Sequence, residues 1–259
     1  MQYARAGHEA VALLLIEHHA DVSARTNAGG MALHDAARSG HATMAGLLIE
    51  HQADVSSKDS AGWTALLRAA FWGHETTARL LIELGADVSA ENNAGWTALL
   101  YAAKGGLETV TRLLIELGSD VSAKDVSGRT ALHWSAIQGH ETVTRLLIEL
   151  GADIAAQSKF GETALHDASF GGHETPVRLL LEAGADEQSK TDDGKTPEDM
   201  ATEQGHHQVA AMIKAEGVRK ARSVAFAMGH HARLGEGTWV EELDAGVVRM
   251  VLEEAAPTL

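Results

Sequence analysis

Cysteine is absent from this chain of 259 residues, which excludes disulfides and cysteine-ligated zinc sites. Long apolar runs are missing as well. The longest, such as Val11 to Ile16, are far too short to span a bilayer, and no signal peptide is visible at the start. Basic residues are outnumbered, with 21 Lys and Arg against 36 Asp and Glu. The resulting net charge of −15 argues against nucleic acid or an anionic membrane as the main partner.

Catalytic motifs are also absent from the contexts that their chemistry requires. There is no G-x-S-x-G, P-loop, H-E-x-x-H or dinucleotide fingerprint, and the short Gly235-Glu236-Gly237 is better interpreted as a turn. The many carboxylates fall in predicted turns or on predicted outer helix faces. The sequence therefore predicts no enzyme, no catalytic residue and no cofactor.

What the sequence does have is a glycine that returns at one fixed interval, with no insertion or deletion. These glycines are Gly29, Gly62, Gly95, Gly128, Gly161 and Gly194. The phrase after each one recurs, as in Gly62-Trp63-Thr64-Ala65-Leu66 and Gly161-Glu162-Thr163-Ala164-Leu165-His166. A second glycine, a histidine and an apolar helical run ending in Gly-Ala-Asp then follow. A repeat whose period lies in the range of about 20–50 residues predicts units that stack in a row, each packing on its neighbours.

The period and both phrases together resemble the ankyrin repeat, over residues 1–217. The resemblance implies an all-α solenoid of stacked helix-turn-helix units with β-turn fingers. We expect a domain at residues 1–217 with a partial first repeat and six further repeats, the last a polar cap. Residues 218–259 leave the pattern and are expected to form a short helical C-terminal tail. Because the first repeat is incomplete, we expect either further repeats upstream, which is favoured, or a frayed end.

Local signals agree with these helix boundaries. The recurring Thr can cap each first helix. Glycines after the first and second helices suit a left-handed residue that ends a helix; they are Gly73, Gly106, Gly139, Gly172 and Gly205, and Gly85, Gly118, Gly151 and Gly184. His19 and Gln52 replace this glycine in the first two copies. A left-handed non-glycine residue costs about 1–2 kcal/mol, so we expect the N-terminal end to be the softer one.

Charged pairs four residues apart mark the opposite, solvated face of the second helices. The pairs are Glu108/Arg112, Glu141/Arg145 and Glu174/Arg178. In this order each pair adds only about 0.3–0.5 kcal/mol, so they indicate an outer face rather than a binding site.

Histidine is present in 15 copies and raises the question of a metal site, but nine of these residues recur at two repeat positions. These are His34, His133 and His166 after Ala-Leu, and His8, His41, His74, His140, His173 and His206 after the second glycine. Their recurrence favours a structural role in which the ring bonds the Thr hydroxyl and a neighbouring turn. The pairs His206-His207 and His230-His231 lack a third ligand, so no metal site is predicted.

Only eleven residues are aromatic, and eight of them fall at variable repeat positions. In the ankyrin family these positions project from the turn fingers and the inner helices onto a concave groove. With nearby cations and one aliphatic residue they form the predicted partner-binding set: Trp63, Arg68, Phe71, Trp72, Trp96, Tyr101, Lys104, Arg129, Trp134, Ile137, Phe160 and Phe170. Partner contact is favoured for Phe71, Trp72, Tyr101, Trp134 and Phe170. For Trp63 and Trp96 a staple that packs on the next turn is an equal alternative.

The sequence therefore predicts a non-enzymatic, monomeric interaction scaffold that binds another protein in the concave groove and turn fingers. The net charge favours a basic or apolar contact surface on the partner. The expected compartment is intracellular, cytoplasmic or nuclear. The alternative is a substrate-recognition adaptor of a ubiquitin ligase, because some ankyrin proteins end in short helical boxes that recruit ligase scaffolds. In that tail Asp244 would cap a helix that turns Val247, Val248, Val251 and Leu252 inward.

Overall fold

A computed structural model describes residues 8–233, and the side chains of residues 8–223. Over this range the chain forms thirteen α-helices and no β-strand. The helices are α2 (Glu9–Glu17), α3 (Ala32–Arg38), α4 (Ala42–Glu50), α5 (Ala65–Phe71), α6 (Glu75–Glu83), α7 (Ala98–Lys104), α8 (Glu108–Glu116), α9 (Ala131–Ile137), α10 (Glu141–Glu149), α11 (Ala164–Gly171), α12 (Glu174–Glu182), α13 (Pro197–Glu203) and α14 (His207–Arg233).

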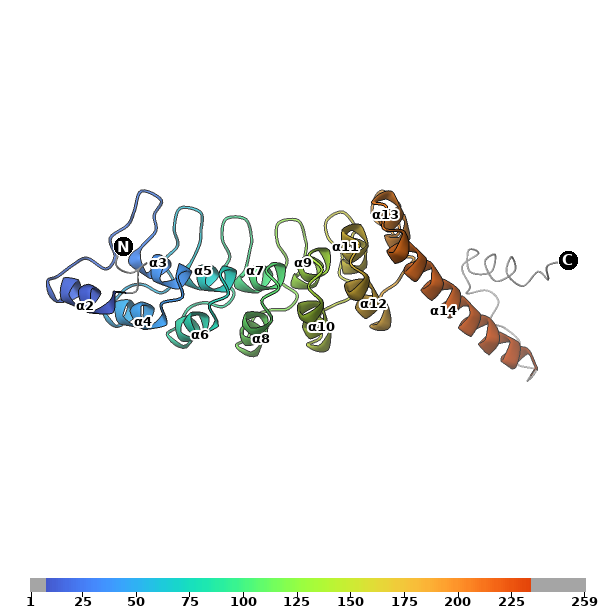
Figure 1. Cartoon of the computed structure of the whole chain (residues 1–259), viewed down its shortest axis with the longest axis horizontal. Helices are drawn as coiled ribbons and strands as arrows, with labels where there is room; N and C mark the ends of the chain where they lie inside the picture. The colour runs from blue at the N-terminus through green and yellow to red at the C-terminus, as the bar shows by residue number, and fades with distance from the viewer. Residues whose placement is uncertain (1–7, 234–259) are drawn as a thin grey trace.

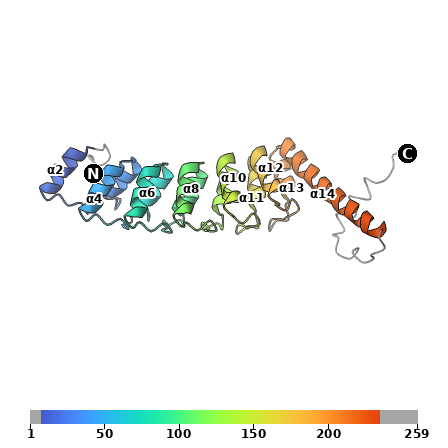
Figure 2. The same ribbon diagram turned by 90° about the horizontal axis from the view of Figure 1, so that it is seen from below.

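The helices form two parallel rows along an elongated stack (Figure 1). The first helix of each repeat lies in one row (α3, α5, α7, α9, α11, α13) and the second helix in the other (α4, α6, α8, α10, α12). From α3 to α12, each helix packs against its antiparallel partner and against the matching helix of the next repeat. Loops project on the side of the first row (Figure 1), and the view from below shows the second row side by side (Figure 2). The predicted all-α repeat solenoid is confirmed.

The predicted helix ends are confirmed as well. The Oγ1 of Thr64 accepts a hydrogen bond from the Leu67 amide at 3.2 Å, which satisfies a free donor of the first turn. All nine glycines expected to be left-handed have φ between 67° and 95°. His19 and Gln52, which replace this glycine, take the same conformation with φ of 63° and 71°. The first complete repeat departs from the pattern, because Met31 stands where the others have Thr.

The recurring histidines bond neighbouring repeats together, as predicted. His133 Nδ1 lies 2.9 Å from the Thr130 hydroxyl and accepts the Thr130 amide at 3.2 Å, while Nε2 donates to the Glu162 carbonyl at 3.1 Å. His166 repeats this arrangement one unit later. The histidines that follow the second glycine bond to the preceding repeat. Their Nε2 donates to a carbonyl 36 residues earlier, at the end of that repeat's first helix, in His74, His140, His173 and His206.

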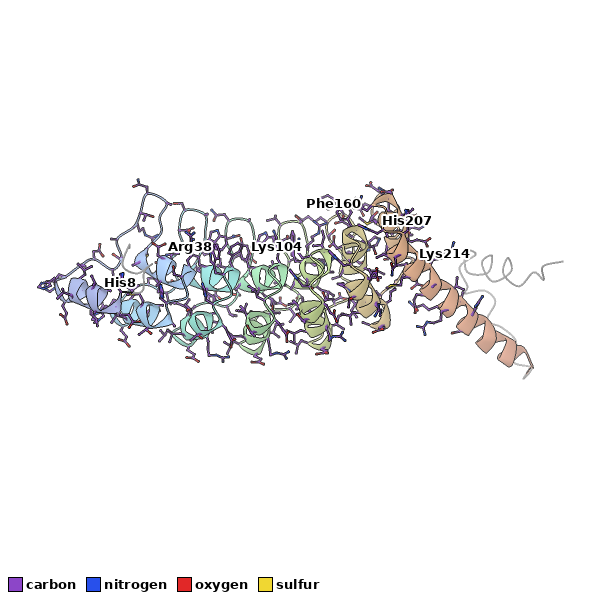
Figure 3. The ribbon with its side chains drawn as sticks, viewed as in Figure 1. His8, Arg38, Lys104, Phe160, His207 and Lys214 are labelled. Carbon is purple, nitrogen blue, oxygen red and sulfur yellow. The ribbon has the colours of Figure 1, made fainter. Side chains whose placement is uncertain are left out.

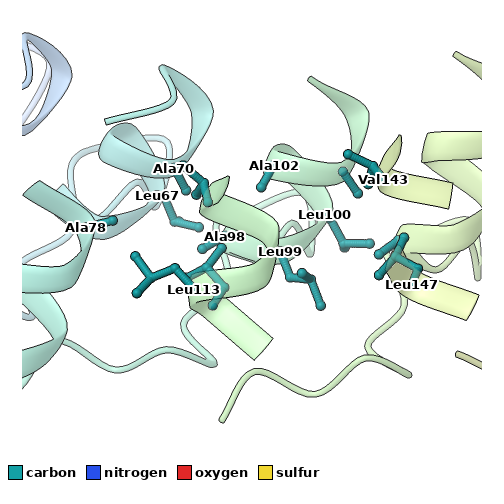
Figure 4. Close-up of a cluster of buried hydrophobic side chains, with 14 of the residues drawn as sticks. Leu67, Ala70, Ala78, Ala98, Leu99, Leu100, Ala102, Leu113, Val143 and Leu147 are labelled. Atoms are coloured by element: carbon teal, nitrogen blue, oxygen red, sulfur yellow. The ribbon is translucent and has the colours of Figure 1, made fainter. Parts of the chain in front are cut away.

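Alanine and leucine side chains fill the space between the rows (Figure 4). Two buried threonines on second helices, Thr144 and Thr111, differ in whether their hydroxyl groups are hydrogen-bonded. The Thr144 hydroxyl donates to Ser135 at 3.0 Å, and Ser135 donates in turn to the Leu132 carbonyl. One repeat earlier the partner position is Ala102, and the buried hydroxyl of Thr111 has no hydrogen-bond partner in the described part of the chain.

The outer face of the second helices carries the expected ion pairs at Glu108–Arg112 and Glu141–Arg145, with nitrogen–oxygen distances of 3.3 and 3.1 Å. The third predicted pair is wrong, because Glu174 accepts a hydrogen bond from Gln208 and forms no ion pair with Arg178 within residues 8–223. Gln208 lies in the first turn of α14, at the position where the preceding repeats have Thr142 and Thr175, so the glutamate has a different neighbour from its counterparts.

The last helix runs without a break through the position where the repeat domain was expected to end. α14 packs on α12 and α13, and Lys220 Nζ lies 2.5 Å from Glu187 Oε2. It then projects beyond the stack (Figure 1). The division at residue 217 stays a prediction, and the expected helix near Asp244 lies outside the described residues. Among residues 8–233, none of the helices combines the length with the hydropathy that a membrane-spanning segment requires.

Candidate functional site

Three positions in each repeat build one surface on the side of the turns and first helices. The first follows the turn glycine, the second lies five residues later inside the first helix, and the third ends that helix. In successive repeats the three positions hold Trp63, Arg68 and Phe71, then Trp96, Tyr101 and Lys104, then Arg129, Trp134 and Ile137. Since every unit has the same backbone, side chains at one position lie in a row along the stack.

Five aromatic rings at these positions, together with Trp72 next to Phe71, form one continuous series, which we call the aromatic ladder. Its order is Trp72, Phe71, Trp63, Tyr101, Trp96 and Trp134. Successive ring centroids are 5.2, 5.6, 4.6, 4.7 and 4.7 Å apart. These separations fall in the range of favourable stacked and edge-to-face pairs, so the rings position one another.

The ladder crosses repeat boundaries by one rule: a turn residue packs on the middle of the first helix in the next repeat. Trp63 stacks on Tyr101 with an interplanar angle of 25°, and Trp96 meets Trp134 at 46°. One unit later Arg129 follows the same rule and bonds Asp167. Trp63 and Trp96 therefore do pack as staples on the following repeat, and they remain partly exposed.

Four cations lie on the faces of these rings. Arg38 lies over Trp72, with its Cζ 5.5 Å from the ring centroid, and Arg68 lies over Trp63 at 5.6 Å. Lys104 Nζ is 4.9 Å from the Trp96 ring and 4.8 Å from the Trp134 ring. Arg129 also lies over Trp134, at 5.8 Å. Cations at these distances are attracted by the negative ring faces.

Polar side chains on the turns hold the middle first-helix residue of this surface, which in each case lies nine residues later in the chain. Asp59 Oδ2 bonds Arg68 at 2.5 Å, Asn92 Nδ2 donates to the Tyr101 hydroxyl at 2.7 Å, and Trp134 Nε1 donates to Asp125 Oδ2 at 3.1 Å. Burial works to raise the pKa of Asp59, but bonds from the Trp63 amide and Arg68 outweigh it and lower that pKa. Burial raises the pKa of the Tyr101 hydroxyl. The ladder is therefore held in place before any partner arrives.

Beyond Trp134 the surface changes from aromatic to ionic. Arg129 lies 2.6 Å from Glu162 Oε2 and 3.3 Å from Asp167 Oδ1. Asp167 is only 1% exposed, and burial raises its pKa to about 7 against the opposing effect of Arg129. This ion cluster closes one end of the ladder, whereas Trp72, which is 50% exposed, forms the open end.

Nine of the twelve residues expected to bind a partner are joined in this network. Ile137, Phe160 and Phe170 are not: no ring or cation contact links them to the ladder in residues 8–223. Phe160 and Phe170 are nevertheless 58% and 43% exposed. Figure 3 places Arg38, Lys104 and Phe160 along the row of first helices and turns. Arg38 was not among the residues predicted from the sequence, although it occupies the same repeat position as Phe71 and Lys104.

Within the same range no three His, Asp or Glu side chains are grouped as a metal ion would require. No curated protein matches the chain. A family model described as "Ankyrin repeats (3 copies)" matches residues 1–92, 89–158 and 151–222. Repeats of this kind are generally protein–protein interaction modules and are typically not enzymes. Since the matches extend over most of its length, the chain belongs to the ankyrin-repeat family.

Proposed function

We propose that this chain is a non-catalytic scaffold that binds a partner protein on the aromatic ladder and the adjoining turns. One observation supports this most: the ladder is a continuous apolar surface with its large rings open to solvent at one end. Trp72 is 50% exposed and Phe71 is 43% exposed. Exposed apolar patches of this kind mark interaction sites, and Trp, Tyr and Arg are the residues that dominate binding energy.

The packing of the ladder favours tight binding from few contacts. Rings that already stack on each other lose little freedom when a partner covers them, so less binding energy is lost to ordering side chains. Phe160 and Phe170 are proposed as secondary contacts on the neighbouring turn and first helix. The partner surface that meets the ladder is apolar, and the overall charge of −15 favours basic groups around that contact.

The test is the double variant Phe71→Ala with Trp72→Ala. Because both side chains are large but about half exposed, the solenoid should stay folded. Proteins captured by the wild type should be lost from the variant, with binding weakened by about 2 kcal/mol or more. The matched control is Leu150→Ala, which removes an equally exposed (40%) apolar side chain after the outer helix α10. Equal losses from both would refute binding at the ladder.

The ubiquitin-ligase adaptor is retained as an alternative, because α14 carries the chain away from the last repeat (Figure 1). A truncation that tests it must follow residue 233 rather than 217. Cutting at 217 would remove Lys220 with its ion pair to Glu187, and the buried Ala221. Loss of a ligase partner with retained binding at the ladder would support the adaptor. Retention of every partner by the truncated chain would refute it.

A further inference from the structure

The four cations on the ladder differ in one respect: two have carboxylate partners and two do not. Arg68 is paired with Asp59, and Arg129 with Glu162 and Asp167. Arg38 and Lys104 form no ion pair with any described residue, and both side chains are exposed. Their described side-chain contacts are with ring faces alone.

An unpaired surface lysine ordinarily needs no explanation, because water solvates its ammonium group. Lys104 is in a different position, since its Nζ lies over two indole rings, Trp96 and Trp134, at the end of the ladder opposite Trp72. A partner that covers the ladder removes water from this group. An unpaired charge buried in that way strongly opposes binding unless the partner supplies an acceptor. A carboxylate is the strongest acceptor that a protein can offer to an ammonium or guanidinium group.

We propose that the ladder binds a segment of the partner with two carboxylates on either side of an apolar side chain. One carboxylate pairs with Lys104, the other with Arg38, and the apolar side chain packs on Phe71 and the rings next to it. This assignment rests on the proposed function and adds the chemistry of the partner. The net charge of −15 does not preclude it, because salt screens charges beyond about 8 Å whereas the two pairs act in contact.

The spacing of the two cations sets the length of the segment. Arg38 and Lys104 occupy the same position two repeats apart. With neighbouring helices about 8–10 Å apart, the two cations are separated by about 20 Å. An extended chain advances about 3.3 Å per residue, so the two carboxylates lie about six residues apart in an extended segment.

The experiment is a selection of random linear peptides displayed on phage against the full chain and against the Lys104→Glu variant. Wild type should enrich peptides with Asp or Glu flanking an apolar residue, and Lys104→Glu should enrich peptides with Lys or Arg instead. The wild-type peptides should bind Lys104→Glu about tenfold more weakly or worse. They should bind Lys104→Arg nearly as well as wild type, because the charge is kept. The outer-face variant Arg145→Glu is the matched control and should leave binding unchanged.

Thermal unfolding of each variant separates loss of binding from loss of fold. Lys104 is exposed and contacts only ring faces, so Lys104→Met should keep the stack and lose the charge preference. Three results would each overturn the proposal. The wild type could enrich basic peptides, the wild type and Lys104→Glu could enrich the same peptides, or neither could enrich any. Where peptides are enriched but do not follow the charge of residue 104, they can be tested on the double variant Phe71→Ala with Trp72→Ala. If they lose binding to that variant, the proposed function stands and the carboxylate assignment is wrong. Peptides unaffected by that double variant would refute binding at the ladder itself.

Discussion

The imidazole of His133 makes the stability of this solenoid depend on pH, and the chain provides an internal control for testing this. The same repeat position holds Leu67 and Leu100 in the two preceding units, where both side chains are fully buried. The backbone therefore accepts leucine at this place. We predict that His133→Leu leaves the fold intact and makes unfolding markedly less sensitive to acid.

The magnitude follows from burial. His133 is 1% exposed, and burial lowers its pKa from 6.5 to about 4. Between these two values the unfolded chain takes up a proton that the folded chain does not, so stability falls as pH falls. The contribution is complete above about pH 6.5 and lost by about pH 4, and it amounts to about 3 kcal/mol. At neutral pH the variant should be less stable by about 1–3 kcal/mol, because it loses the bonds to Thr130 and Glu162.

Urea unfolding followed by circular dichroism at pH values from 7 to 4 measures this dependence in both proteins. The difference in the free energy of unfolding between wild type and variant should shrink to zero, and then change sign, as the solution is acidified. NMR titration of the His133 ring should show no protonation in the folded protein above about pH 5, since its pKa is about 4. Parallel stability curves for the two proteins, or titration of the ring near its ordinary pKa, would refute this reasoning.

Three further predictions concern stability at neutral pH, each measured by chemical unfolding against wild type. Ala102→Ser should give the orphaned Thr111 hydroxyl a partner, as one repeat later, and stabilise the protein by about 1 kcal/mol; a destabilised variant would contradict this. Gln52→Gly should remove the strain of a side chain at φ 71° and gain about 1 kcal/mol; no gain would mean that the strain is absent. Gly139→Ala should destabilise the protein by about 1–3 kcal/mol more than the control Gly151→Ala. The Cβ added at position 139 would lie 2.5 Å from the imidazole of His173 in the next repeat, whereas the Cβ added at position 151 would meet nothing within 4 Å. Equal destabilisation by the two variants would show that the ring moves aside.

Local signals were sufficient to predict the helices and their ends. Thr64, Gly73 and Gly85 each act within one turn of the chain, so the sequence around them determines what they do. The pair Glu174–Arg178 failed for the opposite reason. Its residues have the same local spacing as the pairs that form, but α14 brings Gln208 to Glu174 from a distant part of the chain.

The candidate surface could be predicted only as a set of residue types. The repeat positions predicted nine residues that contact one another through rings, cations or ion pairs in the structure. They also predicted three residues that have no such contact with the ladder among residues 8–223. Arg38 was not found because its role depends on Trp72, which lies in the next repeat. The pairing of Trp63 with Tyr101 was not found because it depends on how far one unit is shifted against the next.

The sequence by itself determined the unit and its repetition, because a fixed interval with recurring caps leaves one backbone for every copy. Only the tertiary structure decided which side chains meet. It packed Trp96 against Trp134, placed Lys104 over both rings, and buried Asp167 beside Arg129. The physical reason is that these contacts cross repeat boundaries, where the offset between packed units, rather than any local preference, brings the atoms together.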